Sequence, residues 1–239
     1  MLAACVTSGD GGSLASADGP LSSEYLTRYA EPDPTPASFL ECHGFGCAET
    51  SRVGLSSAEW GKVKAQLAGP ARDARAERAK IARAVATMQK IVGAKTGTGV
   101  HQWTHENMMI KPNLGDPTQL DCIDEAVNTW TYMTMMERAH LFRFHSVATL
   151  GYAGLPNDTN PRNTAVLREK KGGALYAVDA SLVDGGEPPL VMPLSVWAGA
   201  WPPKLADIEN APGKPARPVK TAAKTVAKTA AKSAALAHD

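Results

Sequence analysis

The sequence predicts an α+β domain in which helices pack on an antiparallel sheet. Two long segments, at about residues 70–92 and 119–138, carry apolar residues at helical spacing, and two later runs are joined by a short glycine-containing loop, as antiparallel strands are. We expect this domain to span residues 37–204, which is enough chain for one core. Residues 1–36 and 205–239 hold few bulky apolar side chains and are expected to be disordered.

Two helices are expected in the first half of the domain. A short one opens at Ser57-Ala-Glu-Trp60. A longer one spans about residues 70–92, because Pro70 suits a helix start and Gly93 suits a helix end. One apolar stripe runs along this longer helix and is formed by Ile81, Val85, Met88 and Val92.

A third helix is expected from Gln119 to Arg138. Thr118 and Asp121 have the spacing of a capping box, in which a hydroxyl and a carboxylate satisfy free backbone donors at a helix start. Apolar side chains behind them again share one face. Cys122 therefore falls in the first turn of this helix.

Strands are expected after the third helix. Residues 141–149 alternate apolar and polar side chains, as a half-buried strand does. Thr164 to Leu167 and Ala174 to Val178 predict two strands joined across residues 170–173. The segment Leu190 to Trp201 is broken by Pro193 and is too short to cross a membrane. We expect it to form either a capping loop and turn around the active face or a packing segment for Trp197 and Trp201.

The length of the loop between the two strands sets which side chains share a face. Four residues would place Asp179 opposite Thr164, with Arg162 on the same face, whereas a change of one residue would bring Asn163 onto that face. In either register, we expect Cys122 and Asp179 to converge beside a strand end.

Cys122 is a candidate nucleophile because of its place at a helix start. The partial positive charge there favours the thiolate, which is the nucleophilic form. Its acidic neighbours Asp121, Asp124 and Glu125 oppose this effect. The alternative is a small buried apolar residue, which is the usual role of a free cysteine.

A helix-start cysteine followed by an antiparallel hairpin resembles the transglutaminase-like branch of the papain-like cysteine peptidases, and more narrowly an uncharacterised bacterial family of that branch. The similarity covers roughly Leu40 to Pro203. It rests on the blocks Gly115-Asp-Pro-Thr-Gln-Leu-Asp-Cys-Ile-Asp-Glu125, Asn128-Thr129, Leu141 to Val147, Thr164-Ala-Val166, Tyr176-Ala-Val-Asp179 and Met192-Pro-Leu-Ser-Val-Trp197. The resemblance implies a papain/transglutaminase-like core that acts on an amide bond without a cofactor.

One position departs from the family pattern. The family places Pro-His before the Thr-Ala-Val block, and here Arg162 stands where that histidine is expected. Arginine cannot replace an imidazole as proton shuttle, because its guanidinium stays protonated. We therefore expect Cys122 as nucleophile and Asp179 as orienting acid in an impaired site, with the backbone N–H of Cys122 and possible help from Gln119 around an oxyanion.

Another histidine could act as the base. His145 lies between Cys122 and Asp179 in the chain and is the best alternative, although an ordinary buried histidine explains it as well. His140 is explained by its place at a helix end. His101 and His105 have the spacing of zinc ligands on a helix, but Gly and Pro around them favour a loop, so we expect no metal site.

The four cysteines suggest an exported protein. Cys42 and Cys47 enclose two glycines and are expected to form a disulfide in an oxidising compartment, or two thiols otherwise. Cys5 follows Leu-Ala-Ala, which resembles a bacterial lipobox, and residues 6–36 would form the tether of a lipoprotein. This chain shows no charged and apolar signal sequence before that box, so export requires a longer natural start, and without one the protein is expected in the cytoplasm.

The end of the chain is basic although the formal net charge of the whole is only +1. A lysine recurs at every fourth position, at Lys220, Lys224, Lys228 and Lys232. Such a segment suits an anionic membrane surface or polymer, while a solvated tail is the alternative. Nothing else resembles a nucleic-acid-binding fold, so nucleic acid is not an expected partner.

Two function classes remain. One is a cysteine hydrolase or acyltransferase that acts on a peptide or cell-wall amide. The other is a non-catalytic envelope protein that binds such a ligand in the same cleft. Arg162 favours the second class, and the retention of Cys122 and Asp179 favours the first.

Overall fold

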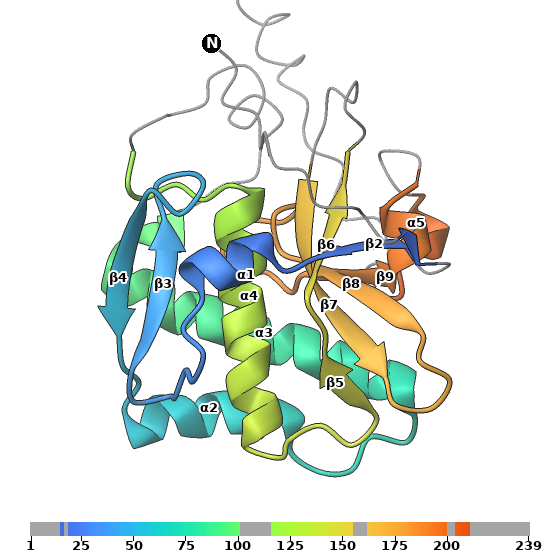
Figure 1. The fold of residues 1–239 in the computed structure, drawn as a ribbon. Helices are drawn as coiled ribbons and strands as arrows, with labels where there is room; N and C mark the ends of the chain where they lie inside the picture. Colours follow the sequence, from blue (N-terminus) through green and yellow to red (C-terminus); the bar gives the residue numbers. More distant parts are fainter. Residues whose placement is uncertain (1–14, 17–18, 101–115, 155–161, 200–203, 211–239) are drawn as a thin grey trace, which may run out of the picture.

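The α+β class is confirmed by the computed structural model, which describes residues 15–16, 19–100, 116–154, 162–199 and 204–210 (Figure 1). The strands are β1 Ala15–Ser16, β2 Gly19–Ser22, β3 Phe39–His43, β4 Glu49–Val53, β5 His145–Val147, β6 Leu150–Ala153, β7 Arg162–Glu169, β8 Leu175–Asp179 and β9 Leu190–Pro193. The helices are α1 Glu24–Tyr29, α2 Ser57–Leu67, α3 Ala74–Thr96, α4 Cys122–Arg138 and α5 Leu194–Trp197, with short 3-10 turns η1 Thr98–Val100 and η3 Leu205–Asp207.

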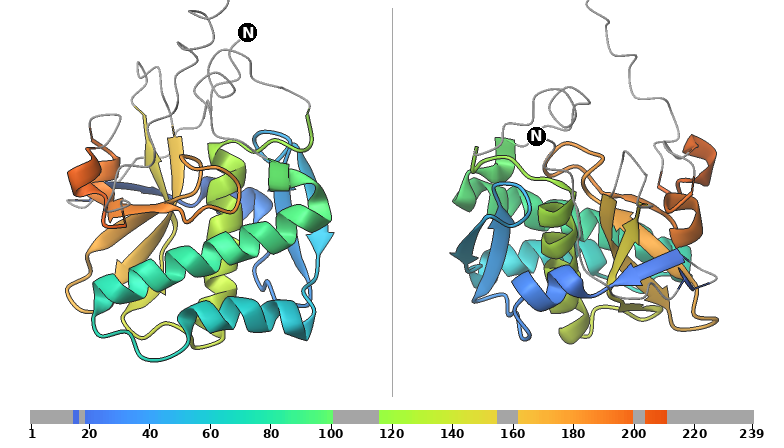
Figure 2. Two further views of the ribbon diagram at one scale, coloured as in Figure 1. Left: turned by 180° about the vertical axis from the view of Figure 1, so that it is seen from behind. Right: turned by 45° about the horizontal axis from the view of Figure 1, so that its top comes forward.

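A main antiparallel sheet lies between α4 and α5 (Figure 2). Its order is β1-β2-β6-β7-β8-β9, with β5 also pairing with β7, while β3 and β4 form a separate hairpin. One face carries Ala165, Leu167 and Val178 into a core shared with α3 and α4. The opposite face carries Val166 and Ala177 into a smaller core around α5.

The β7–β8 turn confirms the predicted register. Glu169 and Ala174 close the turn around residues 170–173, and Ala165 pairs with Val178. One further step along this register sets Thr164 opposite Asp179. Alternation then puts Arg162, Thr164 and Asp179 on one face and Asn163 on the other.

Helix α3 begins and ends later than the predicted range of residues 70–92. Its N-cap is Asp73, whose carboxylate accepts the Ala76 N–H at 2.7 Å, and its left-handed C-cap is Gly97. Gly93 lies inside the helix for a packing reason: a Cβ there would lie 2.7 Å from the backbone of Gly99. Helix α2 follows its predicted start, with a capping box between Ser56 and Glu59.

The predicted strand at residues 141–149 is shorter in the structure. The Glu77 carboxylate accepts the backbone N–H groups of Arg143, Phe144 and His145 at 2.8–3.0 Å. A helix side chain thus takes donors that a strand partner would otherwise use, and regular pairing is confined to β5.

The segment after Leu190 is not the predicted capping loop. It forms strand β9, which pairs with β8, and then the short helix α5. The expected packing role of Trp197 is confirmed, because this side chain is fully buried. Trp201 lies outside the described residues.

Both ends of the folded unit extend beyond the predicted residues 37–204. Strand β2 pairs with β6, and α1 buries Tyr25. At the other end, both carboxylate oxygens of Glu209 accept from Arg78 at 2.7 Å. These anchors were missed because each uses only one or two side chains in an otherwise polar segment. Within the described residues, no helix combines the length and apolar character that crossing a membrane requires.

Candidate functional site

Helix α4 begins at Cys122, so its expected place in the first turn is confirmed. The N-cap is Asp121, which accepts the N–H groups of Ile123 and Asp124, and Asp124 in turn accepts the N–H of Asp121. The predicted start near Gln119 is wrong, because the Thr118 hydroxyl donates to Asp116 at 2.7 Å and does not cap the helix.

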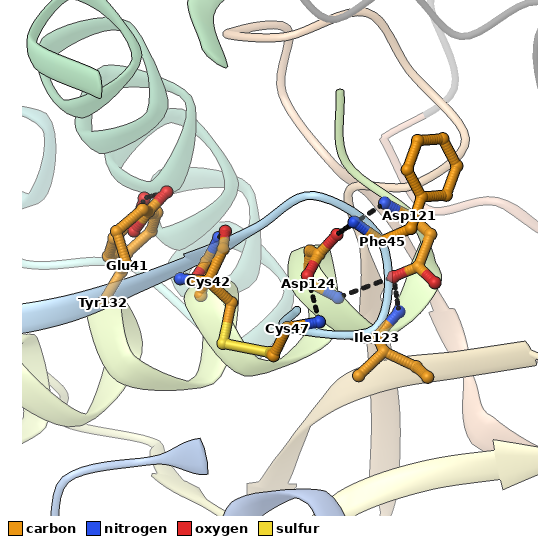
Figure 3. The surroundings of a disulfide bond; sticks show 9 residues. Glu41, Cys42, Phe45, Cys47, Asp121, Ile123, Asp124 and Tyr132 are labelled. Atoms are coloured by element: carbon orange, nitrogen blue, oxygen red, sulfur yellow. Dashed lines mark hydrogen bonds between the residues drawn. A yellow bond between two sulfur atoms is a disulfide. The ribbon is translucent and has the colours of Figure 1, made fainter. Parts of the chain in front are cut away.

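The predicted disulfide between Cys42 and Cys47 is present, and its loop is bound to the start of α4 (Figure 3). Asp124 accepts the N–H of Phe45 at 3.0 Å and that of Cys47 at 2.6 Å. The Asn128 side-chain amide accepts the backbone N–H of Cys42 and donates to the backbone carbonyl of Cys42, each at 2.8 Å. The disulfide loop therefore fixes the helix turn that carries Cys122.

This loop also has an unusual backbone. Gly44, Phe45, Gly46 and Cys47 all have positive φ, and for Phe45 and Cys47 this left-handed conformation is unfavourable without outside support. The disulfide and the two bonds to Asp124 supply that support. Strained backbone of this kind persists only where the surrounding structure holds it, and here the loop is held against the first turn of α4.

Cys122 is 7 % exposed and lies on the α4 side of the sheet. The side-chain amide of Asn163, on β7, donates toward the Cys122 sulfur at 3.9 Å. A weak donor at this distance suits either a thiol or a thiolate, but it cannot take up a proton.

Asp179 lies on the opposite face, against α5. One carboxylate oxygen accepts the Trp197 indole N–H at 2.6 Å, and the other accepts the hydroxyl and N–H of Ser181 at 2.7 and 3.0 Å. Burial raises the pKa of Asp179 above its usual range, and the bonds from Ser181 and Trp197 and the charge of Arg162 offset this only in part.

Arg162 shares that face. Its guanidinium donates to the carbonyl oxygens of Trp197 at 2.7 Å and Gly199 at 3.1 Å, and it lies 5.2 Å from the centre of the Trp197 ring. Arg162 and Asp179 thus hold α5 against the end of the sheet.

The expected convergence of Cys122 with Asp179 is therefore wrong. The register and the shared face of Arg162 and Asp179 were predicted correctly, but α4 packs on the other face of the sheet. Strand alternation shows which residues share a face, and it does not show which face a helix will cover. Asn163, named only for a different register, is the residue that reaches the sulfur.

His145 does not serve as the alternative base. Arg78 donates to its Nε2 at 3.0 Å, so Nδ1 carries the proton that Glu77 accepts at 2.9 Å. His145 pairs with Glu169, six residues from Asn163 along β7, or roughly 20 Å. Sequence alone could not separate this structural role from a catalytic one.

The structure also places His43, His140 and Gln119. His43 bonds Ser51 on the β3–β4 hairpin, and His140 follows the end of α4 in a left-handed conformation. The Gln119 side chain donates to Thr118 at 3.4 Å, so its role at an oxyanion stays a prediction. His101, His105, Cys5 and the lysines of the basic tail lie outside the described residues.

One cluster has the composition of a metal site but not its chemistry. The two sulfur atoms of Cys42 and Cys47 and a carboxylate oxygen of Asp124 lie within 4.8 Å of one another. The sulfurs are bonded to each other, and the Asp124 oxygens accept backbone N–H groups. This cluster does not hold a metal while the disulfide is intact.

Comparisons of the chain with protein-family models, curated proteins and solved structures found no match. The resemblance to transglutaminase-like cysteine peptidases remains a prediction.

Proposed function

We propose that this chain is a non-catalytic binding domain of the cell envelope, built on a transglutaminase-like plan that has no working triad. The observation that carries the proposal is that the Asp179 carboxylate bonds Ser181 and Trp197 on the α5 side of the sheet, whereas Cys122 packs in the core on the α4 side. In the described residues, the Asp179 carboxylate and both nitrogens of His145 are bonded within the scaffold. A peptide or cell-wall amide is the expected ligand, and the disulfide fits an oxidising compartment.

Co-sedimentation with purified peptidoglycan sacculi tests this proposal. We expect the full chain and Cys122→Ala to bind equally, because binding does not use the thiol as nucleophile. A variant with Lys220, Lys224, Lys228 and Lys232 all changed to Gln separates attraction by the basic tail from binding by the folded domain. Binding that disappears in this variant, or no binding at all, would refute a folded cell-wall-binding domain.

A second candidate is a cysteine amidase or acyltransferase. It is favoured by the place of Cys122 at the first position of a 17-residue helix, with an amide donor next to its sulfur. Hydrolysis of peptide amides, or amine incorporation into them, that is lost in Cys122→Ser would support this function over the first. Equal background rates in both proteins would exclude it for the substrates assayed.

A further inference from the structure

A small cavity lies beneath the start of α4, among α3, α4 and β3. Glu41, Gln89, Thr98 and Glu125 contribute to its wall, and its volume of about 10 Å³ leaves room for roughly one water-sized particle. It lies on the α3–α4 side of the sheet and does not include Cys122 or Asp179.

Two oxygen atoms of this wall have no hydrogen-bond partner among the residues that the structure describes. They are Oε1 of Gln89 and Oε1 of Glu125, on side chains that are 9 % and 2 % exposed. The Gln89 amide nitrogen donates to the other Glu125 oxygen at 2.9 Å, which sets the orientation of the amide. Leaving such acceptors buried and unbonded is costly.

Glu41 adds a second carboxyl group. Both of its oxygens lie 2.6–2.7 Å from the Tyr132 hydroxyl, which has one proton to donate. Among the described residues, no Lys, Arg or His side chain forms an ion pair with Glu41 or Glu125. The cavity wall is therefore rich in acceptors and poor in positive charge.

We propose that this cavity binds one hard divalent cation through oxygen atoms of Glu41, Glu125 and Gln89. Two carboxylates balance the charge of such an ion, and a ligand set made only of oxygen suits Ca²⁺ or Mg²⁺ rather than Zn²⁺. The cavity has no room for the several waters that Mg²⁺ keeps in its regular octahedral shell, so Ca²⁺, which exchanges its waters for protein oxygens more readily, is the expected ion.

Protons compete with the cation for the same oxygens. Burial raises the pKa of Glu41 well above its usual range and that of Glu125 to about 7, each despite one hydrogen bond that lowers it. Neighbouring carboxylates raise both pKa values further: Glu125 and Asp124 act on Glu41, and Asp179 and Asp121 act on Glu125. The cation must displace these protons, so its binding strengthens as pH rises. A water molecule beside protonated carboxyl groups is the competing occupant.

The test compares the full chain with Glu125→Gln by thermal unfolding and calorimetric titration with Ca²⁺ and with Mg²⁺, at pH 6 and pH 8. Glu187→Gln is the matched control, because it makes the same chemical change at an exposed position. Terbium luminescence sensitised by nearby aromatic side chains, of which Tyr132 contacts Glu41, is a second readout, and its loss in Glu125→Gln but not in Glu187→Gln assigns the signal to this cavity.

We expect Ca²⁺ to raise the melting temperature of the full chain and of Glu187→Gln at pH 8, with a smaller effect at pH 6. Glu125→Gln should bind about 10-fold more weakly or worse, because it loses one of two charged ligands. No ion-dependent change in the full chain at pH 8, or an equal change in Glu125→Gln, would overturn the proposal and assign the cavity to water and carboxyl protons.

Discussion

Asn163 and Arg162 are neighbours in the chain but lie on opposite faces of β7, and this alternation determines what each can do to Cys122. Asn163 reaches the sulfur, whereas Arg162 binds the carbonyl oxygens that end α5. A histidine restores a base beside the thiol only if it replaces the residue on the correct face.

We expect Asn163→His to increase the thiolate fraction of Cys122 at neutral pH about tenfold, because an adjacent imidazolium stabilises thiolate. Arg162→His should leave it unchanged. The measurement is the pH dependence of iodoacetamide labelling, followed on the Cys122 peptide by mass spectrometry. A larger effect from Arg162→His than from Asn163→His would show that the faces have been assigned wrongly.

Glu125 gives the stability of the chain a definite pH dependence. Burial raises its pKa from 4.5 to about 7 in the folded protein, against the bond from Gln89. Between these values the folded state holds a proton that the unfolded chain has released, so the free energy of unfolding falls as pH rises from about 4.5 to about 7.

Glu125→Gln removes this titration. In a chelating buffer, we expect the free energy of unfolding of the variant, measured relative to that of the unaltered chain, to increase by about 2–3 kcal/mol when the pH is raised from 5 to 8. Urea unfolding at the two pH values measures the difference. A pH-independent difference would mean that Glu125 is ionised throughout.

At the scale of elements, local patterns predicted the existence of helices and strands better than their limits. The capping box of α2 and the β7–β8 turn depend on residues close in sequence and were predicted. The limits of α3 and β5 depend on contacts between distant segments, such as Gly93 with Gly99 or Glu77 with the backbone at 143–145. No single-sequence pattern contains those contacts.

The buried guanidinium of Arg78 joins helix α3 to strands β5, β7 and β8 and to the segment that follows η3. It bonds Glu209, Glu169 and His145, and it lies 3.5 Å from the centre of the Tyr176 ring. Removing one partner from a buried charge network is far more costly than removing an exposed charge.

We therefore expect Arg78→Met to lower the free energy of unfolding by about 3 kcal/mol, since its acidic partners retain some exposure. Arg83→Met, an exposed position on the same helix, should change it by less than about 0.5 kcal/mol. Chemical denaturation measures both. Hydrogen exchange at residues 204–210 should also increase in Arg78→Met, and equal stability of the two variants would contradict the role of the network.

For the whole molecule, the predicted disulfide is present, but lipidation of Cys5 remains a prediction. We expect natively expressed protein to carry an acylated Cys5, a Cys42–Cys47 bridge and one reduced thiol at Cys122. Mass spectrometry of the intact protein and its peptides checks all three. An unmodified Cys5 together with reduced Cys42 and Cys47 would contradict the envelope localisation and indicate a cytoplasmic protein.

Engineered disulfides test most directly whether Cys122 faces Asn163 and not Asp179. In a Cys5→Ser background, Asn163→Cys should form a bond with Cys122 under mild oxidation, because the native Asn163 amide nitrogen lies 3.9 Å from the sulfur. Asp179→Cys should not, because the Asp179 side chain lies toward Trp197 on the α5 side of the sheet, whereas Cys122 packs on the α4 side. Peptide mapping that finds Cys122 joined to position 179, and not to position 163, would contradict this account and restore the triad.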